Sequence, residues 1–230
     1  MHPRHLLAGL PGLLILAALR AQGQEQDRPF AVIARVGAQV PARLFSPYPP
    51  DLGIGPSVEL AVSRALLPWL EVELAAGWSR STAPTQSSLL PGDPADPSSP
   101  LVPLHVTQRL TTVPVLANLR ARWPSPWAVR PYLVAGGGGL HADLRVDTGS
   151  SSLYPSRDAT GWAPVLQAGF GADLRPGSGL LVGVEARWRW GHATLRERTH
   201  PSPYVLFGQS RSGDADLGAF CAQATAGWRF

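Results

Sequence analysis

Hydrophobic residues recur at every second position in several separate segments of this chain. The clearest segment is residues 217–230, where one alternating set is apolar: Phe220, Ala222, Ala224, Ala226 and Trp228. The intervening set contains Gln223, Thr225 and Arg229. A period of two places successive side chains on opposite faces of an extended strand. We therefore predict a β-strand with one apolar and one polar face that ends on the aromatic residue Phe230.

Seven further segments alternate in the same way, which makes eight predicted strands in all. They are residues 30–40, 54–65, 69–80, 106–123, 130–146, 161–175 and 180–191. In 130–146 the alternation predicts an apolar outer face of Tyr132, Val134, Leu140, Ala142 and Leu144, and an inner face with His141, Asp143 and Arg145. Four glycines, 136–139, interrupt this strand, and glycine permits the sharp curvature of a small closed wall. The fold class is therefore predicted to be all-β.

The connections between these strands alternate in length. Those after the second, fourth and sixth strands are short, and those after the first, third, fifth and seventh are long. Residues 81–104, rich in Ser, Pro, Asp and Thr, are predicted to be an extended mobile loop because they lack the apolar residues of a core. Residues 41–51, 147–160 and 193–216 are the other predicted long loops after strands. All long loops then lie at one end of an antiparallel up-and-down sheet.

The first residues have the features of a secretory signal peptide. Arg4 precedes an apolar run over 6–19, and small residues follow at Ala17, Ala18 and Ala21. We expect a signal peptide over 1–21, with cleavage between 18 and 24, a short periplasmic segment over 22–29, and the barrel over 30–230.

Charge and cysteine content narrow the possible partners. The formal net charge is +4, and part of it belongs to Arg4 and Arg20 of the leader, so the sequence gives no indication of nucleic-acid binding. Cys221 is the single cysteine, which excludes an internal disulfide. It falls on the predicted inner face, where a buried thiol is expected to be inert.

Alternation alone does not say which face of the sheet points inward. A secreted β-sandwich or a lipocalin-like barrel turns its apolar face inward, whereas a membrane barrel turns it outward to lipid. Aromatic residues at two levels favour the membrane barrel, because such barrels carry an aromatic girdle at each interface. The candidate girdle residues are Trp69, Trp78, Trp123, Trp127, Trp162, Trp190, Trp228 and Phe230.

Three motifs carry a family resemblance that spans the predicted barrel. They are GWRF at 227–230, TVPV at 112–115 and RPYL at 130–133. With them the chain resembles the small bacterial outer-membrane β-barrel superfamily typified by OmpA, OmpX and OmpW. The resemblance implies an eight-stranded antiparallel up-and-down transmembrane β-barrel with short periplasmic turns and long extracellular loops. It also implies that Phe230 is the signal for assembly into the outer membrane.

The polar faces of the predicted strands collect charges of both signs. The candidate lumen network is Arg35, Glu59, Glu71, Glu73, Arg120, Arg122, Asp143, Asp173, Glu185, Arg187, Arg189 and Arg229. Unpaired charges in a narrow dry lumen carry a large desolvation penalty, so we expect acid–arginine pairs that fill the barrel. The alternative is a narrow pore or portal for small hydrophobic molecules.

A lipid A-modifying enzyme is the third possibility. Some eight-stranded outer-membrane barrels modify lipid A with a Ser and a His near the outer leaflet, and His192 lies at the outer end of a predicted strand. No Ser or acid stands at a suitable spacing from it. His105, His141 and His200 come from separate segments without metal-ligand spacing, and the glycine run follows no phosphate-binding pattern. We therefore expect no catalytic residue, metal or cofactor.

The expected role is structural or in surface interaction. The expected partners are outer-membrane lipid and lipopolysaccharide, whose phosphates loop arginines such as Arg196 and Arg198 can bind. The barrel assembly machinery is a further expected partner. We expect no nucleic acid as partner, and a monomer.

Overall fold

The computed structural model is built almost entirely of β-strands. It describes residues 29–41, 52–83, 85–93, 96–123, 128–148, 156–174, 179–197 and 212–230. The predicted signal peptide, the segment 22–28, Trp127 and His200 lie outside these residues. Ten strands are described: β1 (Phe30–Pro41), β2 (Gly55–Leu67), β3 (Leu70–Thr82), β4 (Gln86–Asp93), β5 (Asp96–Arg122), β6 (Val129–Asp147), β7 (Arg157–Leu174), β8 (Leu180–Glu197), β9 (Ser212–Asp216) and β10 (Ala219–Arg229). Within the described part of the chain, no helix is long and apolar enough to cross a membrane.

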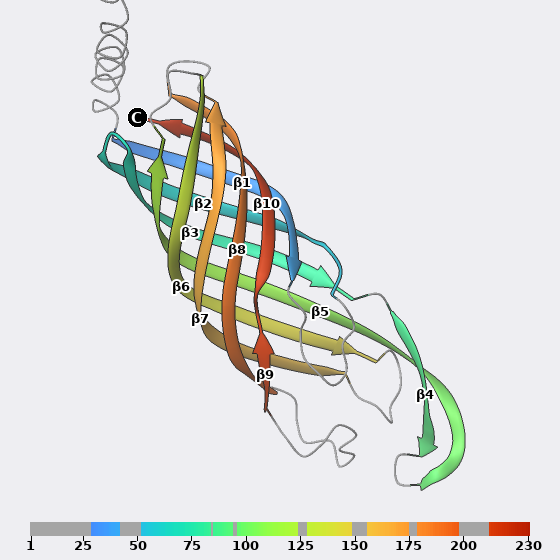
Figure 1. The fold of residues 1–230 in the computed structure, drawn as a ribbon. Helices are drawn as coiled ribbons and strands as arrows, with labels where there is room; N and C mark the ends of the chain where they lie inside the picture. Colours follow the sequence, from blue (N-terminus) through green and yellow to red (C-terminus); the bar gives the residue numbers. More distant parts are fainter. Residues whose placement is uncertain are drawn as a thin grey trace, which may run out of the picture.

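Eight of these strands close into a ring (Figure 1). The order is β1, β2, β3, β5, β6, β7, β8 and β10, with every neighbour antiparallel. The last strand closes the wall, since Trp228 pairs with Val32 of β1 and Gln223 pairs with Glu185 of β8. Closure leaves no free sheet edge around the ring. The predicted eight-stranded barrel is confirmed.

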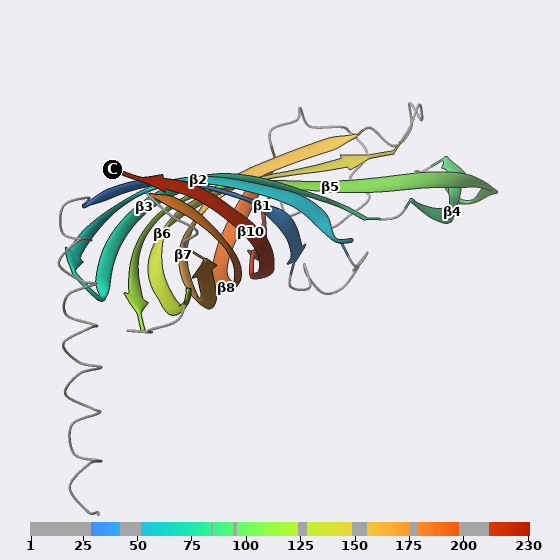
Figure 2. The same ribbon diagram turned by 90° about the horizontal axis from the view of Figure 1, so that it is seen from above.

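The tract at 81–104 is not the loop that we predicted. Residues 86–93 form β4, which pairs with the first part of β5, for example Ser88 with Leu104, and the pair projects beyond the ring as an arm (Figures 1 and 2). At its tip, Asp96 Oδ1 accepts hydrogen bonds from the Ser98 hydroxyl at 2.6 Å and the Ser98 backbone N–H at 2.9 Å, and both lower the pKa of Asp96. Two strands can pair through their backbones alone, so a polar composition did not exclude them.

The predicted loops 147–160 and 193–216 are also shorter than expected. Strand β7 begins at Arg157, β8 continues to Glu197, and β9 occupies 212–216, paired with β8. The strands on this side of the barrel therefore extend past the segments that alternate clearly.

The two described ends of the chain meet at the end of the barrel with the short connections. The Phe30 backbone N–H donates to Phe230 O at 3.2 Å, and the two rings stack with centroids 6.4 Å apart. The Arg229 N–H donates to the carbonyl of Gly179, which precedes β8. Gly179 has φ 107°, a conformation that glycine adopts without strain. Phe230 thus lies on the seam between the first and last strands.

The outer face of the ring is apolar and the inner face is polar over the half of the barrel next to the short connections. Outward side chains such as Val36, Leu74 and Leu166 are 61%, 65% and 67% exposed. Inward neighbours such as Arg35 and Glu73 are fully buried. This distribution is the reverse of that in a water-soluble barrel and is that of a transmembrane barrel. The predicted faces are confirmed in every ring strand except β6.

In β6 our assignment of the two faces is wrong by one residue. Tyr132, Val134, Leu140 and Ala142 are buried inside the barrel, while Leu133 is 65% exposed on the outside. The partly exposed Asp143 lies on the outer face. Glycines fill the middle of β6, and both of its alternating sets contain apolar residues. The average polarity of each set therefore predicted the wrong face.

The polarity of the inner and outer faces is reversed in the half of the barrel next to the long connections. Toward the long connections the interior is an apolar cluster: Leu52, Ala83, Leu110, Leu116, Leu140, Ala142, Ala163, Val165, Ala193, Leu195, Ala215 and Leu217. The outward side chains there are polar, and include Thr194, Arg145 and Arg196. Polar residues outside and apolar residues inside are typical of a wall whose outer surface contacts water. This half of the barrel therefore stands clear of the lipid.

Exposed aromatic residues mark both limits of the apolar outer belt. Trp69, Trp123, Trp228 and Phe230 lie at the short-connection end, and Trp78, Trp162, Trp188, Trp190 and Phe220 lie further along their strands. The separation is about ten residues, and at ~3.3 Å per residue and a tilt of ~40° it spans about 25 Å, the height of the apolar band of an outer-membrane barrel.

Candidate functional site

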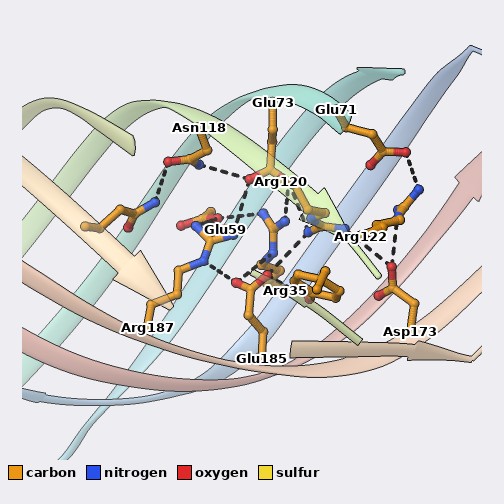
Figure 3. Close-up of polar contacts among 12 residues, drawn as sticks. Arg35, Glu59, Glu71, Glu73, Asn118, Arg120, Arg122, Asp173, Glu185 and Arg187 are labelled. Atoms are coloured by element: carbon orange, nitrogen blue, oxygen red, sulfur yellow. Dashed lines mark hydrogen bonds and ion pairs between the residues drawn. The ribbon is translucent and has the colours of Figure 1, made fainter. Parts of the chain in front are cut away.

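A cluster of charged side chains fills the interior at the level of the apolar belt (Figure 3). The side chains come from alternate, inward-facing positions of the strands, such as Glu71 and Glu73 of β3 or Arg120 and Arg122 of β5. Among the described residues, seven of the eight ring strands contribute a charged side chain, and β6 contributes Tyr132. The sequence places these residues together because each strand keeps its polar set on one face and ring closure turns all of these faces inward.

Glu73 lies at the centre of this cluster and is 0% exposed. Its carboxylate accepts a hydrogen bond from Arg35 of β1. Its Oε1 also accepts from Asn118 Nδ2 at 3.0 Å and Arg187 Nη2 at 3.2 Å, and its Oε2 accepts from Arg120 Nη2 at 3.2 Å. One carboxylate therefore joins β1, β3, β5 and β8 across the interior.

Glu185 of β8 forms the second junction. It pairs with Arg187, with Arg120 at 3.3 Å and with Arg35 at 3.4 Å, and its Oε2 accepts a hydrogen bond from the Tyr132 hydroxyl at 2.8 Å. The Arg120 guanidinium lies 4.2 Å from the centre of the Tyr132 ring, a cation–π contact. Tyr132 thus joins β6 to the cluster.

A third group of contacts lies around Glu71. Its Oε1 accepts from Arg122 of β5 and from Arg229 of β10. Arg122 also donates to Asp173 of β7 at 3.2 Å. These contacts join the closing strand to the rest of the cluster.

Glu59 completes the cluster from β2. Its Oε1 accepts from Arg35 at 2.7 Å and from Arg187 at 3.1 Å. The remaining arginine, Arg189, lies 3.8 Å from Glu59 Oε2. That distance is too long for a hydrogen bond.

Asp143 does not belong to the cluster, although we predicted it there. It lies on the outer face of β6, in register with Thr111 and Thr160, because the face of this strand was assigned wrongly. The other eleven predicted residues are buried inside the barrel: Arg35, Glu59, Glu71, Glu73, Arg120, Arg122, Asp173, Glu185, Arg187, Arg189 and Arg229.

Three buried members of the cluster were missing from the predicted set. Tyr132 was assigned to the outside, and Asn118 and Gln167 were placed inside but were not selected as site residues. Gln167 donates to Asn118 Oδ1 at 2.7 Å, and Asn118 in turn donates to Glu73. Asn118 and Gln167 could have been found from the sequence because they lie in the set of their strand that also carries charged residues. A criterion based on charge alone missed them.

Glycines make room for these side chains. A Cβ at Gly136 would lie 2.2 Å from Asn118 Oδ1, and a Cβ at Gly171 would lie 2.4 Å from the Tyr132 hydroxyl oxygen. Both distances are far inside van der Waals contact. Gly136 of β6 and Gly171 of β7 are thus required by close approach inside the wall, in addition to the curvature that we predicted from the sequence.

The remaining candidate residues lie apart from this cluster. His192 is exposed on the outer face of β8, and its backbone pairs with Asp216 of β9. His141 packs edge-on against Trp162 on the outer wall, with ring centres 5.1 Å apart. Cys221 is buried, and its thiol donates to Gln39 Oε1 at 3.6 Å. Among the described residues, no three His, Cys, Asp or Glu side chains are grouped to hold a metal ion.

The chain is similar to several solved barrels at low identity. Neisserial surface protein A is 12% identical, with 87% of this chain and 97% of that chain covered and a TM-score of 0.47. OprG, an outer membrane protein from Pseudomonas aeruginosa, is 14% identical, with 88% and 97% covered and a TM-score of 0.49. Ail, the attachment invasion locus protein of Yersinia pestis, is 11% identical, with 88% and 99% covered and a TM-score of 0.47. Likenesses at this level concern the general form of the barrel and extend no further. No protein-family model and no curated protein matches the chain.

Proposed function

We propose that this protein is an outer-membrane β-barrel with a structural or surface-interaction role, a sealed lumen and no catalytic activity. The observation that carries the proposal is the buried charged cluster, which joins all eight ring strands across the interior. A closed barrel with an apolar outer belt of about 25 Å has the form that bacterial outer-membrane proteins take. We infer that the charges inside it hold the wall together.

Two packed layers support the sealed lumen. The charged cluster fills the interior at the level of the belt, and the apolar cluster that includes Leu52, Leu110 and Leu217 fills it toward the long connections. The cavity beside Arg189 has a volume of about 10 Å³, which is the space of a single water molecule. Conduction needs a continuous path wide enough for an ion together with the water or protein groups that solvate it. Within the described part of the chain, these two layers therefore support a filled lumen.

Surface interaction is supported by the part of the barrel that stands clear of the lipid. The arm of β4 and the first residues of β5 carries exposed apolar side chains, with Leu101 57% and Val102 37% exposed. Arg145 and Arg196 lie on the outer wall beyond the aromatic belt, where arginine can pair with the phosphates of lipopolysaccharide. We also propose that lipid contacts the apolar outer belt and that the barrel assembly machinery binds at Phe230. We propose that the protein is a monomer.

A groove on the outer wall favours a second candidate, a portal for small hydrophobic molecules. It has a volume of about 370 Å³ and is lined mainly by outward apolar residues of β1, β2 and β3, among them Val36, Leu60 and Trp78. The small residues Ala34, Ala76 and Gly77 also line it, together with Arg35 and Glu59. Uptake of a small hydrophobic solute by cells that make the protein, compared with cells that do not, tests this role. An increase that Ala76→Leu, on the exposed outer face of β3, abolishes would favour the portal.

Conductance across a planar bilayer tests the sealed lumen. We expect the purified barrel to add no resolved current steps to the membrane. As a positive control, Glu73→Ala combined with Arg187→Ala removes two side chains from the centre of the cluster and should produce openings if the barrel still assembles. Reproducible current steps from the unaltered protein would defeat the proposal.

A further inference from the structure

The groove on the outer wall lies in the half of the apolar belt that faces the outer leaflet. Its outward lining consists of two rows of side chains that pair in register across β1, β2 and β3: Val36, Val58 and Trp78 in one row, and Ala34, Leu60 and Ala76 in the other. Trp78 marks the limit of the belt next to the long connections, which are extracellular in this class of barrel. The groove therefore starts at the outer-leaflet interface and runs toward the middle of the membrane.

The groove presents an apolar surface to the membrane. Arg35 and Glu59 also line it, but their charged groups lie inside the barrel, where they pair at 2.7 Å with side chains 0% and 3% exposed. The volume of about 370 Å³ is that of a small-ligand site. Water would lose hydrogen bonds against such a lining, so hydrocarbon is the favoured occupant.

Arg80 lies just beyond this groove on the same strand as Trp78. It follows Trp78 by two positions and shares its outward face, because Ser79 and Ser81 are buried inside the barrel. Two residues at ~3.3 Å each and a tilt of ~40° place Arg80 about 5 Å above Trp78, in the headgroup layer of the outer leaflet. A cation thus stands at the mouth of an apolar groove.

Arg109 of β5 adds a second cation beside Arg80. Arg80 is in register with Thr111, so Arg109 is its diagonal neighbour, and long side chains at diagonal positions are within reach of each other. Arg109 is also directly opposite Arg145 of β6, and like charges at opposite positions are unfavourable. The Arg109 Nε is buried without a hydrogen-bond partner among the described atoms. An anionic group at this point would offset the concentration of positive charge.

We propose that the groove and these two arginines bind one molecule of lipopolysaccharide. A phosphate of its lipid part accepts charge-assisted hydrogen bonds from Arg80 and Arg109, and one acyl chain of the same molecule lies in the groove. Lipopolysaccharide fits because it carries phosphates and acyl chains together and occupies the outer leaflet. The inference rests on the proposed outer-membrane role and makes this groove a lipid site.

Native mass spectrometry of the barrel extracted from outer membranes in mild detergent tests this site. The method weighs each barrel with the lipid that stays attached, and we expect one lipopolysaccharide molecule on the unaltered protein. Lipopolysaccharide without phosphates should bind the delipidated barrel about tenfold more weakly, because it lacks the charge-assisted hydrogen bonds. Equal binding of the two forms would overturn the proposal. Equal or tighter binding of phosphatidylglycerol would overturn the assignment to lipopolysaccharide.

Variants locate the site on the wall. Arg80→Gln combined with Arg109→Gln should weaken lipopolysaccharide binding by a similar factor, and Ala76→Leu should weaken it by filling part of the groove. Arg64→Gln is the matched control for charge, since Arg64 is exposed on the outer face of β2 at the short-connection end. Ala135→Leu is the control for size, on the exposed face of β6 away from the groove. Both controls should bind as the unaltered protein does.

Each variant is first shown to reach the outer-membrane fraction and to change its gel migration on boiling, so that lost lipid does not reflect a lost barrel. Absence of the unaltered protein from that fraction would contradict both the proposed function and this site. Its presence there without lipopolysaccharide, or arginine variants that bind as much as the unaltered protein, would overturn this site alone. A small solute or a second copy of the chain in the groove in place of lipopolysaccharide would also overturn it.

Discussion

Glu73→Gln is the substitution for which the structure predicts the largest effect in the charged cluster. The change keeps the size of the side chain, so it opens no cavity, and it removes the charge that faces Arg35, Arg120 and Arg187. Those three guanidiniums must then share Glu59, Glu185 and Asp173, and the cluster loses one of its negative charges. Removing one partner of a buried ion pair costs about 3–5 kcal/mol, because the remaining charge stays buried. We expect a loss of that size in the free energy of unfolding.

The assay is urea unfolding of the barrel folded into lipid vesicles, with the folded fraction read from tryptophan fluorescence. Asp158→Asn is the matched control, since it also converts a carboxylate to an amide in an arginine pair. Its pair with Arg145 is 3.8 Å long, with side chains 54% and 41% exposed, and such surface pairs contribute about 0–1 kcal/mol. If the two variants lost equal stability, the cluster would not be holding the wall together.

Four smaller predictions follow from the same structure. Tyr132→Phe removes the hydroxyl that donates to Glu185 and should lower the free energy of unfolding by about 1–3 kcal/mol in urea titration, whereas no change would place Tyr132 outside the cluster. Leu133→Arg puts a charge on the lipid face and should destabilise the barrel in vesicles by about 2–4 kcal/mol, and a neutral result would contradict lipid contact there. Deletion of Phe230 should lower the amount of protein assembled in the outer membrane by immunoblot, and unchanged assembly would weaken its role as a signal. His192→Ala should leave the lipid A mass spectrum of cells that make the protein unchanged, and a peak that is lost only in this variant would indicate catalysis.

Much of this fold could be predicted from the sequence because each ring strand repeats one simple pattern. Where one alternating set is clearly apolar and the other charged, as around Glu71 and Glu73, the faces follow directly from the period of two. The charged residues could be placed in one interior because ring closure turns every polar face inward. The individual pairs could not be predicted, because they depend on strand stagger, which brings Glu73 to Arg187 across the barrel.

The errors have physical causes that alternation does not contain. In β6 the assumption that apolar residues face lipid fails, because the strand leaves the membrane and Leu140 and Ala142 pack into an apolar interior. The arm of β4 and β5 is stabilised by backbone pairing, which leaves no hydrophobic period in the sequence. Tyr132 was assigned to lipid as an apolar aromatic, whereas its hydroxyl gives it a partner inside.

The migration of the protein in a denaturing gel, measured on the outer-membrane fraction with and without boiling, tests the central claim most directly. A closed barrel stabilised by a continuous ladder of backbone hydrogen bonds and a buried charged cluster resists unfolding by detergent until it is heated. We predict that the protein is found in the outer-membrane fraction and migrates to different positions before and after boiling. A protein in the soluble fraction whose migration boiling does not change would contradict the transmembrane barrel.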